Sequence, residues 1–275
     1  MKKERRTKII YLIIYFIFIL VIAISTTYIF KMILLNKEAI EESQLLNNIN
    51  MSSAKKNVDL TEEEGENISI NKEKQIKEQK ESVERILKLK KLQEINYDII
   101  AWIEIEGTNI NYPVLQGKDN DYYLTHNYKK QKTEKGSIFL DSDYDWTLPS
   151  TNLLIYGHNL INGQMFKDLL KYSDEEFYKK HPTICFTTKD KDAEFEIISA
   201  FKSRVYYKDE KNVFRYYDFI NAKTEEEYDQ FVKNAKEASL YNINKKAKYG
   251  DQLITLVTCS YHTENGRFVV IGREK

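Results

Sequence analysis

The stretch TLVTCSYHTENGRFVVIGR, residues 255–273, contains two apolar runs rich in β-branched residues, separated by a polar segment. Runs of this kind are typical of β-strands, and their arrangement predicts an antiparallel hairpin. Cys259 ends the first run and Arg267 begins the second, with seven residues between them. On neighbouring strands these two side chains would lie close together. The hairpin is therefore either an ordinary pair of strands with a buried cysteine or half of a catalytic site.

Segments of the same kind recur from residue 96 onward. Short runs rich in Ile, Val, Tyr and Phe are separated by Gly, Asn and Asp, a pattern typical of β-strands. About eight strands at this spacing predict a mainly β fold, a single barrel or sandwich. Two helical inserts interrupt them, and the second opens with Thr224 and Glu227 at capping-box spacing. The expected strands are IIAWIEIEG, NINYPVLQ, GSIFLD, NLLIYGH, TICFTT, AEFEIISAFKS, QLITLVTC and GRFVVIG, and the expected helices are GQMFKDLLKYSDEEFYKKH and AKTEEEYDQFVKNAKEAS.

Near the N-terminus, residues 9–30 form an uncharged apolar run. As a helix this run would be about 33 Å long, enough to span a bilayer core of roughly 30 Å. Residues 1–8 are strongly basic, so the positive-inside rule places them in the cytoplasm and the rest of the chain outside. A cleaved signal peptide also begins with basic residues, but its apolar core is shorter and is followed by small residues. We therefore expect a cytoplasmic tail over 1–8 and one uncleaved transmembrane signal anchor over 9–30, in the cell membrane.

Residues 31–75 are poor in aromatic residues and rich in Asn, Glu, Lys and Ser, a composition typical of a flexible stalk. Helical periodicity then predicts a helix from about residue 74 to residue 93, with a membrane-proximal coiled coil as the alternative. The folded domain is expected over residues 76–275. The chain has 42 basic and 42 acidic residues, so the part beyond the basic N-terminus is net acidic. That balance argues against nucleic acid as a partner.

Several side chains could carry nucleophilic chemistry. Cys259 lies where a strand opens into a polar loop, so its thiol can be exposed and reactive, although free cysteines are also often buried. Cys185, inside TICFTT, is better explained as packing. Of four histidines, His158 is the best placed base because it follows the run NLLIY between Gly and Asn, and His262 is second. No pair of histidines or cysteines has the spacing of a zinc site, so we expect no metal and no cofactor.

Arg267 has two possible roles. As a charge on an edge strand it would discourage aggregation. As a fixed guanidinium beside a cysteine nucleophile it would donate to the oxyanion that forms when a thiolate attacks a carbonyl.

Three of these segments carry a family resemblance. TLVTC followed by GRFVVIGR, with NLLIYGHN upstream, resembles the sortases, membrane-anchored cysteine transpeptidases of Gram-positive bacteria. WIEIEGTNINYPVLQGKDNDYYLTHNY and KGSIFLD are similar to class B in particular, and the resemblance covers about residues 80–275. It implies an eight-stranded sortase-type β-barrel with an N-terminal helix and helical inserts. It also implies that Cys259 is the nucleophile, His158 the acid and base, and Arg267 the oxyanion donor.

The same resemblance implies a reaction and its partners. A sorting-motif peptide of a secreted surface protein would be cleaved after threonine through a thioester to Cys259, and a peptidoglycan precursor amine would resolve the thioester. By motif position, Asn120 and Leu124 would line the substrate groove, and Val257 and Ser260 would flank the nucleophile, with the Ser260 amide as a second oxyanion donor. Two alternatives stay open. A secreted cysteine protease would use water as the acceptor, and a non-catalytic cell-surface binding module would leave Cys259 as packing.

Overall fold

The computed structural model describes residues 15–30, 33, 69–148 and 151–275. The chain divides into two compact units, residues 1–48 and 49–275. In the first unit, residues 15–30 are helical and exposed. Among the residues described, no helix combines the length and the apolarity that crossing a membrane requires. The expected tail over 1–8 and most of the expected stalk lie outside the described residues, as does part of the expected span over 9–30.

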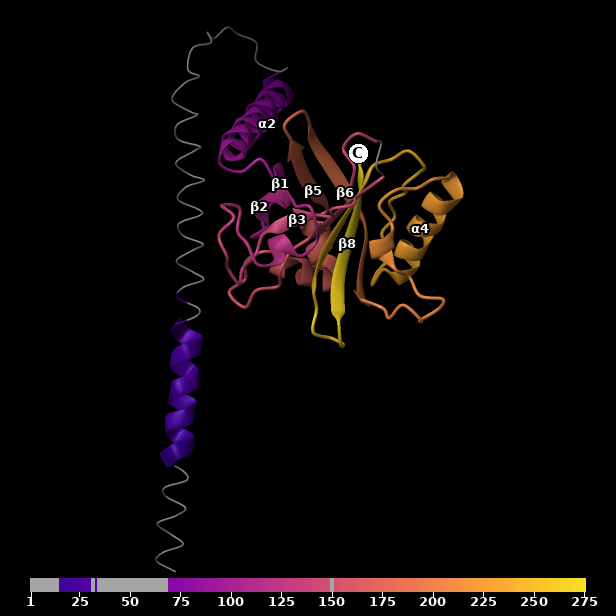
Figure 1. Cartoon of the computed structure of the whole chain (residues 1–275). Coiled ribbons are helices and arrows are strands. Elements are labelled where there is room, and N and C mark those ends of the chain that lie inside the picture. Colours follow the sequence, from indigo (N-terminus) through magenta and orange to yellow (C-terminus); the bar gives the residue numbers. More distant parts are fainter. Residues whose placement is uncertain (1–14, 31–32, 34–68, 149–150) are drawn as a thin grey trace, which may run out of the picture. The chain divides into compact units, whose positions relative to one another are not determined.

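The second unit is built on a closed barrel of eight strands, in the order β1-β2-β3-β4-β7-β8-β6-β5. Of these, β5, β6 and β8 lie side by side in Figure 1. All eight predicted strands are present, and the sheet closes as a barrel rather than a sandwich. Two neighbouring pairs, β2 with β3 and β4 with β7, are parallel, and the others are antiparallel. The strands are β1 (Ile99–Glu104), β2 (Asn111–Gln116), β3 (Ile138–Leu140), β4 (Asn152–Tyr156), β5 (Thr183–Thr188), β6 (Asp192–Arg204), β7 (Leu253–Cys259) and β8 (Gly266–Glu274).

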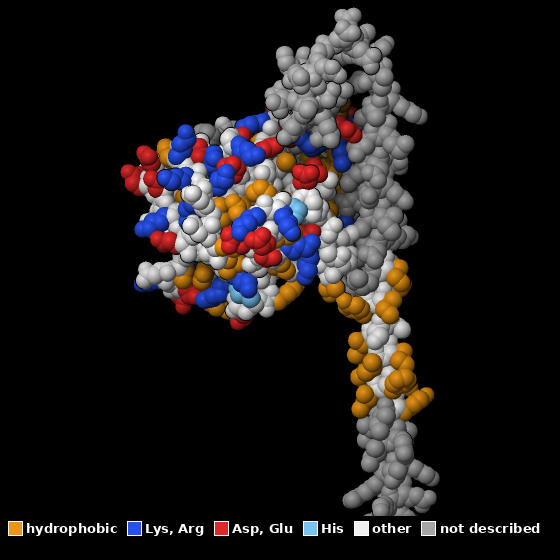
Figure 2. All heavy atoms as spheres, turned by 180° about the vertical axis from the view of Figure 1, so that it is seen from behind, with side chains coloured by type: hydrophobic (Ala, Val, Ile, Leu, Met, Phe, Trp, Pro, Cys, Tyr) orange, Lys and Arg blue, Asp and Glu red, His pale blue; other side chains and the backbone are white. Residues whose placement is uncertain are grey.

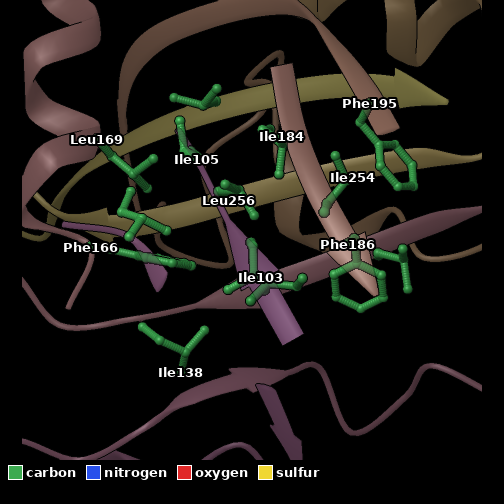
Figure 3. Close-up of a cluster of buried hydrophobic side chains, with 14 of the residues drawn as sticks. Ile103, Ile105, Ile138, Phe166, Leu169, Ile184, Phe186, Phe195, Ile254 and Leu256 are labelled. Carbon is green, nitrogen blue, oxygen red and sulfur yellow. The ribbon is translucent and has the colours of Figure 1, made fainter. Parts of the chain in front are cut away.

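Alternation along the strands separates two apolar clusters. Ile254 and Leu256 of β7 point into the barrel, where they pack with Ile103 and Phe186 (Figure 3). Val257, one position on from Leu256, belongs to a second cluster on the outer face of the same strand. Because side chains alternate along a strand, Cys259 lies on this outer face, two positions beyond Val257. The outer cluster includes side chains of α4 (Glu225–Ala238), which therefore covers this side of the barrel.

The helices largely follow the predicted positions. The helix before the barrel, α2 (Ser69–Ile95), begins before residue 74, so the last part of the expected stalk is helical. The first insert forms η2 (Lys167–Ser173) and α3 (Glu175–Lys180). At the start of α4 the Thr224 hydroxyl accepts a hydrogen bond from the Glu227 amide, while the Glu227 carboxylate binds the amide of residue 223 instead of that of Thr224.

Two short 3-10 turns complete the domain, η1 (Tyr122–Leu124) between β2 and β3 and η3 (Tyr216–Asp218) between β6 and α4. Acidic and basic side chains are interspersed over the face of the domain seen in Figure 2. Mixed charge of this kind is typical of a solvated surface.

Candidate active site

Strand register places the expected nucleophile and cation directly opposite each other. In the antiparallel pair of β7 and β8, Cys259 faces Arg267 across the ladder, which confirms the juxtaposition predicted from the hairpin. Both side chains are half-buried. On the other side of β7, β4 runs parallel with Tyr156 opposite Val257. Two residues further along this register, His158 comes level with Cys259. The ends of three strands therefore carry the three candidate catalytic residues.

Direct hydrogen bonds join the segment around His158 to the end of β7. The Thr258 hydroxyl donates to the Gly157 carbonyl at 2.8 Å, and the Asn159 side-chain amide donates to the Cys259 carbonyl at 2.9 Å. The Gly157 amide in turn donates to a carbonyl of β7 at 3.1 Å. His158 thus lies between two residues that are each bonded to the strand of the cysteine, so the histidine and cysteine backbones are held in a fixed relation.

The imidazole of His158 is half-buried and has a backbone partner from a third segment. Its Nε2 lies 2.8 Å from the carbonyl oxygen of Leu124, the last residue of η1. Since a carbonyl can only accept, Nε2 carries the hydrogen of this bond. The loop between β2 and β3 therefore takes part in the site through its main chain.

The other three histidines have separate partners. His262 is exposed on the β7–β8 loop with its Nδ1 2.9 Å from the Ser260 hydroxyl, and burial together with nearby Lys202 lowers its pKa. The rings of His126 and His181 each approach a backbone carbonyl in loops outside the β4–β7–β8 end. The backbone connections to the strand of Cys259 therefore favour His158 over His262.

The guanidinium of Arg267 is oriented by its own turn. Nη1 donates to the carbonyls of Asn265 at 3.2 Å and Gly266 at 3.0 Å. The remaining donors, on Nη2 and Nε, are left for other partners. Burial raises the pKa of Tyr156 and of Tyr216, and the positive charge of Arg267 opposes both rises. Both phenols therefore remain neutral hydroxyls within electrostatic range of this cation.

Asn120, expected in the substrate groove, braces a neighbouring loop. Its side-chain amide donates to the Asp141 carboxylate at 3.0 Å, and its carbonyl accepts from the Ser142 amide at 2.8 Å. Asp141 is buried and also accepts from the Tyr156 hydroxyl at 2.9 Å. In this structure Asn120 is thus bonded to Asp141, which also binds Tyr156, a tyrosine within electrostatic range of Arg267.

The other expected groove residues differ in what they expose. Leu124 has 37% of its surface exposed, whereas Val257 is 2% exposed and packs under the outer face. The backbone amide of Ser260 donates to the Gly266 carbonyl at 3.0 Å, closing the β7–β8 hairpin. That amide is therefore not free to bind an oxyanion, in contrast to the expected second donor, because the ladder continues one residue past the cysteine.

Three residues of the site were not singled out by sequence reasoning. Asn159 and Thr258 each adjoin a candidate catalytic residue in the motifs GHN and TC, and a polar side chain beside an apolar strand is a signal that could have found them. Asp141 follows directly after β3, but nothing in the sequence predicts that Tyr156 would reach it.

The two cysteines, both free, differ in environment. Burial and the nearby carboxylate of Glu194 raise the pKa of Cys185 to about 11, which leaves little thiolate at neutral pH. In the described ranges, no three His, Cys, Asp or Glu side chains cluster as metal ligands.

Comparison with known proteins agrees with this geometry. Residues 103–275 match the sortase domain family. The chain belongs to the sortase family. Sortase B of Listeria monocytogenes is 37% identical over 191 residues, which are 67% of this chain and 73% of that protein. As a sortase of the B type, the chain is a cysteine transpeptidase enzyme.

Solved sortase structures share the fold. The X-ray structure of sortase B from Clostridium perfringens matches with a TM-score of 0.61 and 35% identity, covering 68% of this sortase and 98% of that chain. A complex of Staphylococcus aureus sortase B with substrate matches with a TM-score of 0.62 and 30% identity, covering 73% and 90% respectively.

Proposed function

We propose that this sortase attaches secreted proteins to the cell wall. It cleaves a C-terminal sorting motif after threonine and transfers the protein to an amine of a peptidoglycan precursor. The observation that carries the proposal is the register of β7 and β8, which sets Cys259 opposite Arg267 with His158 level with both. The relative from Staphylococcus aureus, solved as a complex of sortase B with substrate, supports a sortase reaction for this chain.

The first half of the reaction is acyl transfer to the thiol. The Cys259 thiolate attacks the threonyl carbonyl carbon, a C–S bond forms, and the carbonyl electrons move to an oxygen that the Arg267 guanidinium stabilises. When this intermediate collapses, the C–N bond breaks and the leaving amine takes a proton from the His158 imidazolium. The products are a thioester and a free amine.

The second half regenerates the enzyme. The acceptor amine attacks the thioester carbon and gives a proton to the neutral His158 imidazole, and the C–S bond breaks to release the Cys259 thiolate. Water in place of the amine would give hydrolysis by the same residues. Which acceptor reacts is therefore decided by competition at the thioester.

The sorting motif lies, in this proposal, along the outer face that carries the catalytic residues. Leu124 contributes exposed apolar surface, the buried Val257 and Ser260 flank Cys259, and Asn120 acts through its bonds to Asp141 and Ser142. The enzyme is held at the cell membrane by a single span over residues 9–30, with its N-terminus in the cytoplasm and its catalytic domain outside. The apolar run and the basic residues before it support this orientation.

The test uses the full chain in detergent with a library of peptides that contain candidate sorting motifs. Mass spectrometry should find an acyl-enzyme at Cys259, and an added amine should intercept the thioester so that an amide forms in place of the hydrolysed product. Cys259→Ala provides the matched inactive control. A product with no amide at any amine concentration would favour the protease alternative, and an absence of acylation with every peptide would favour a binding module.

A further inference from the structure

One hydrogen bond defines the chemistry of the His158 ring. Nε2 donates to the Leu124 carbonyl at 2.8 Å, and the ring has no other hydrogen bond to the described residues. In a neutral imidazole only one nitrogen carries hydrogen, so Nδ1 holds the lone pair. Nδ1 is therefore the ring atom that is left to take up and return a proton.

The Leu124 carbonyl is attached to a rigid part of the domain. The neighbouring Tyr123 is fully buried, and its hydroxyl donates to Asp98 at 2.6 Å and accepts from the Asn96 amide at 3.0 Å. Its own carbonyl accepts from the Ser137 amide at 2.9 Å. Because Asn96 directly follows α2, the histidine is braced through η1 by the corner between α2 and β1.

Gly136 provides the space in which this bond forms. Its φ of +60° is a conformation that side-chain-bearing residues rarely adopt. A Cβ there would lie 2.6 Å from the Leu124 carbonyl oxygen, 2.8 Å from the Tyr123 carbonyl oxygen and 3.0 Å from Cδ2 of His158. Two of these atoms belong to the main chain and cannot turn away as a flexible side chain would. A residue with a side chain at 136 therefore displaces the acceptor of the histidine.

We propose that the Leu124 carbonyl is the third member of the catalytic constellation and that Gly136 is the positioning residue that permits it. The carbonyl fixes the Nε2–H tautomer and leaves Nδ1 to exchange protons with the thiol and the amines. The catalytic meaning of this assignment rests on the proposed function, whereas the tautomer does not. A neutral carbonyl takes the orienting role that a carboxylate has in Ser-His-Asp sites, but at Nε2 instead of Nδ1, so it orients the imidazolium without contributing a full negative charge.

Kinetics of glycine variants test the positioning role. Gly136→Ala should lower kcat by about 10²-fold, the scale expected when a catalytic group is misplaced by an ångström, with KM for the peptide little changed. Gly250→Ala is the matched control because Gly250 also has a positive φ, +96°, but a Cβ there meets nothing within 4 Å. Gly250→Ala therefore tests the cost of a side chain at a positive φ, without any contact of the new Cβ with neighbouring atoms. Gly136→Asn separates the two causes further, since Asn tolerates positive φ better than Ala but keeps the Cβ.

Two measurements need no substrate and so remain informative if the proposed function fails. Nitrogen-15 NMR of the His158 ring, assigned with His158→Gln, should show the neutral ring protonated at Nε2 in the native protein. Alkylation of Cys259 at neutral pH should be slower in Gly136→Ala than in Gly250→Ala. A neutral ring protonated at Nδ1 would overturn the proposal, and so would a Gly136→Ala enzyme as active as the control. If that variant does not fold, the tautomer of the native protein decides.

Discussion

Replacing Arg267 by lysine tests whether the guanidinium acts as an oxyanion donor or only as a surface charge. The change keeps the positive charge and nearly the length of the side chain. In the structure, Nη1 is occupied by the carbonyls of Asn265 and Gly266, which orients the rest of the planar group. Arginine thus meets both carbonyls and still has three N–H groups, on Nη2 and Nε, in fixed directions.

Lysine cannot bind both carbonyls and still present several N–H donors in fixed directions. Its ammonium has three hydrogens, and two of them would be needed by the same carbonyls, leaving one donor on a mobile stem. Loss of one oxyanion donor typically lowers kcat by about 10²–10³, or about 3–4 kcal/mol of transition-state stabilisation. Arg267→Lys should therefore lower kcat by this order, while Tm stays close to that of the native protein because the charge and most of the packing remain.

The assay is steady-state transpeptidation, with thermal unfolding measured in parallel. Arg273→Lys is the matched control, since Arg273 lies on the same strand and pairs with Glu196 at 2.7 Å in a salt bridge. We expect this control to change Tm more than kcat. If kcat of the Arg267→Lys enzyme stays within about threefold of the native value, the decrease is far smaller than removal of an oxyanion donor causes. Arg267 would then be only a surface charge.

Three further predictions concern the thiols, the second histidine and a buried polar pair. A thiol reagent should label Cys259 at neutral pH and leave Cys185 unmodified until the pH approaches its pKa of about 11, because only the thiolate reacts; peptide mapping of the labelled protein decides, and equal labelling would contradict the assignment. His262→Ala should retain nearly full kcat, because this exposed ring is bonded, among the residues that the structure describes, to a serine hydroxyl; a loss comparable to that in a His158→Ala enzyme would instead assign the acid–base role to His262. Thr255→Val should lower the free energy of unfolding by about 1–3 kcal/mol, since it removes the hydroxyl that donates at 2.8 Å to the side-chain oxygen Oδ1 of the fully buried Asn152. Chemical denaturation measures this, and an unchanged midpoint would contradict it.

The strands and the catalytic pair were predictable from sequence because both follow from local pattern. Short β-branched runs mark each strand, and a hairpin with seven intervening residues leaves few registers, so Cys259 could be placed near Arg267 in advance. The proximity of His158 was different, since it depends on the parallel pairing of β4 with β7. The family resemblance supplied that part.

Features that depend on backbone atoms were not predictable. Nothing in the order of the residues indicates that the Ser260 amide would be used by Gly266 or that the Leu124 carbonyl would meet His158. Helix α2 begins at Ser69, before the predicted residue 74, because its first turns lack an apolar stripe that periodicity could detect. Helix propensity of Lys, Glu and Gln is sufficient there, whereas periodicity reports only the buried face.

The position of β8 in the barrel has a consequence for how the enzyme becomes active during synthesis. This strand is made after β1–β7, yet it lies between β7 and β6 and contributes Arg267. A nascent chain that has not yet reached β8 has its thiol but neither the neighbouring cation nor a closed barrel. The separation between Asn159 and Cys259, 100 residues along the chain, likewise delays the contact that sets the histidine beside the cysteine. The insertion of β8 between β7 and β6 therefore closes the barrel and sets Arg267 opposite Cys259 in the same step of folding.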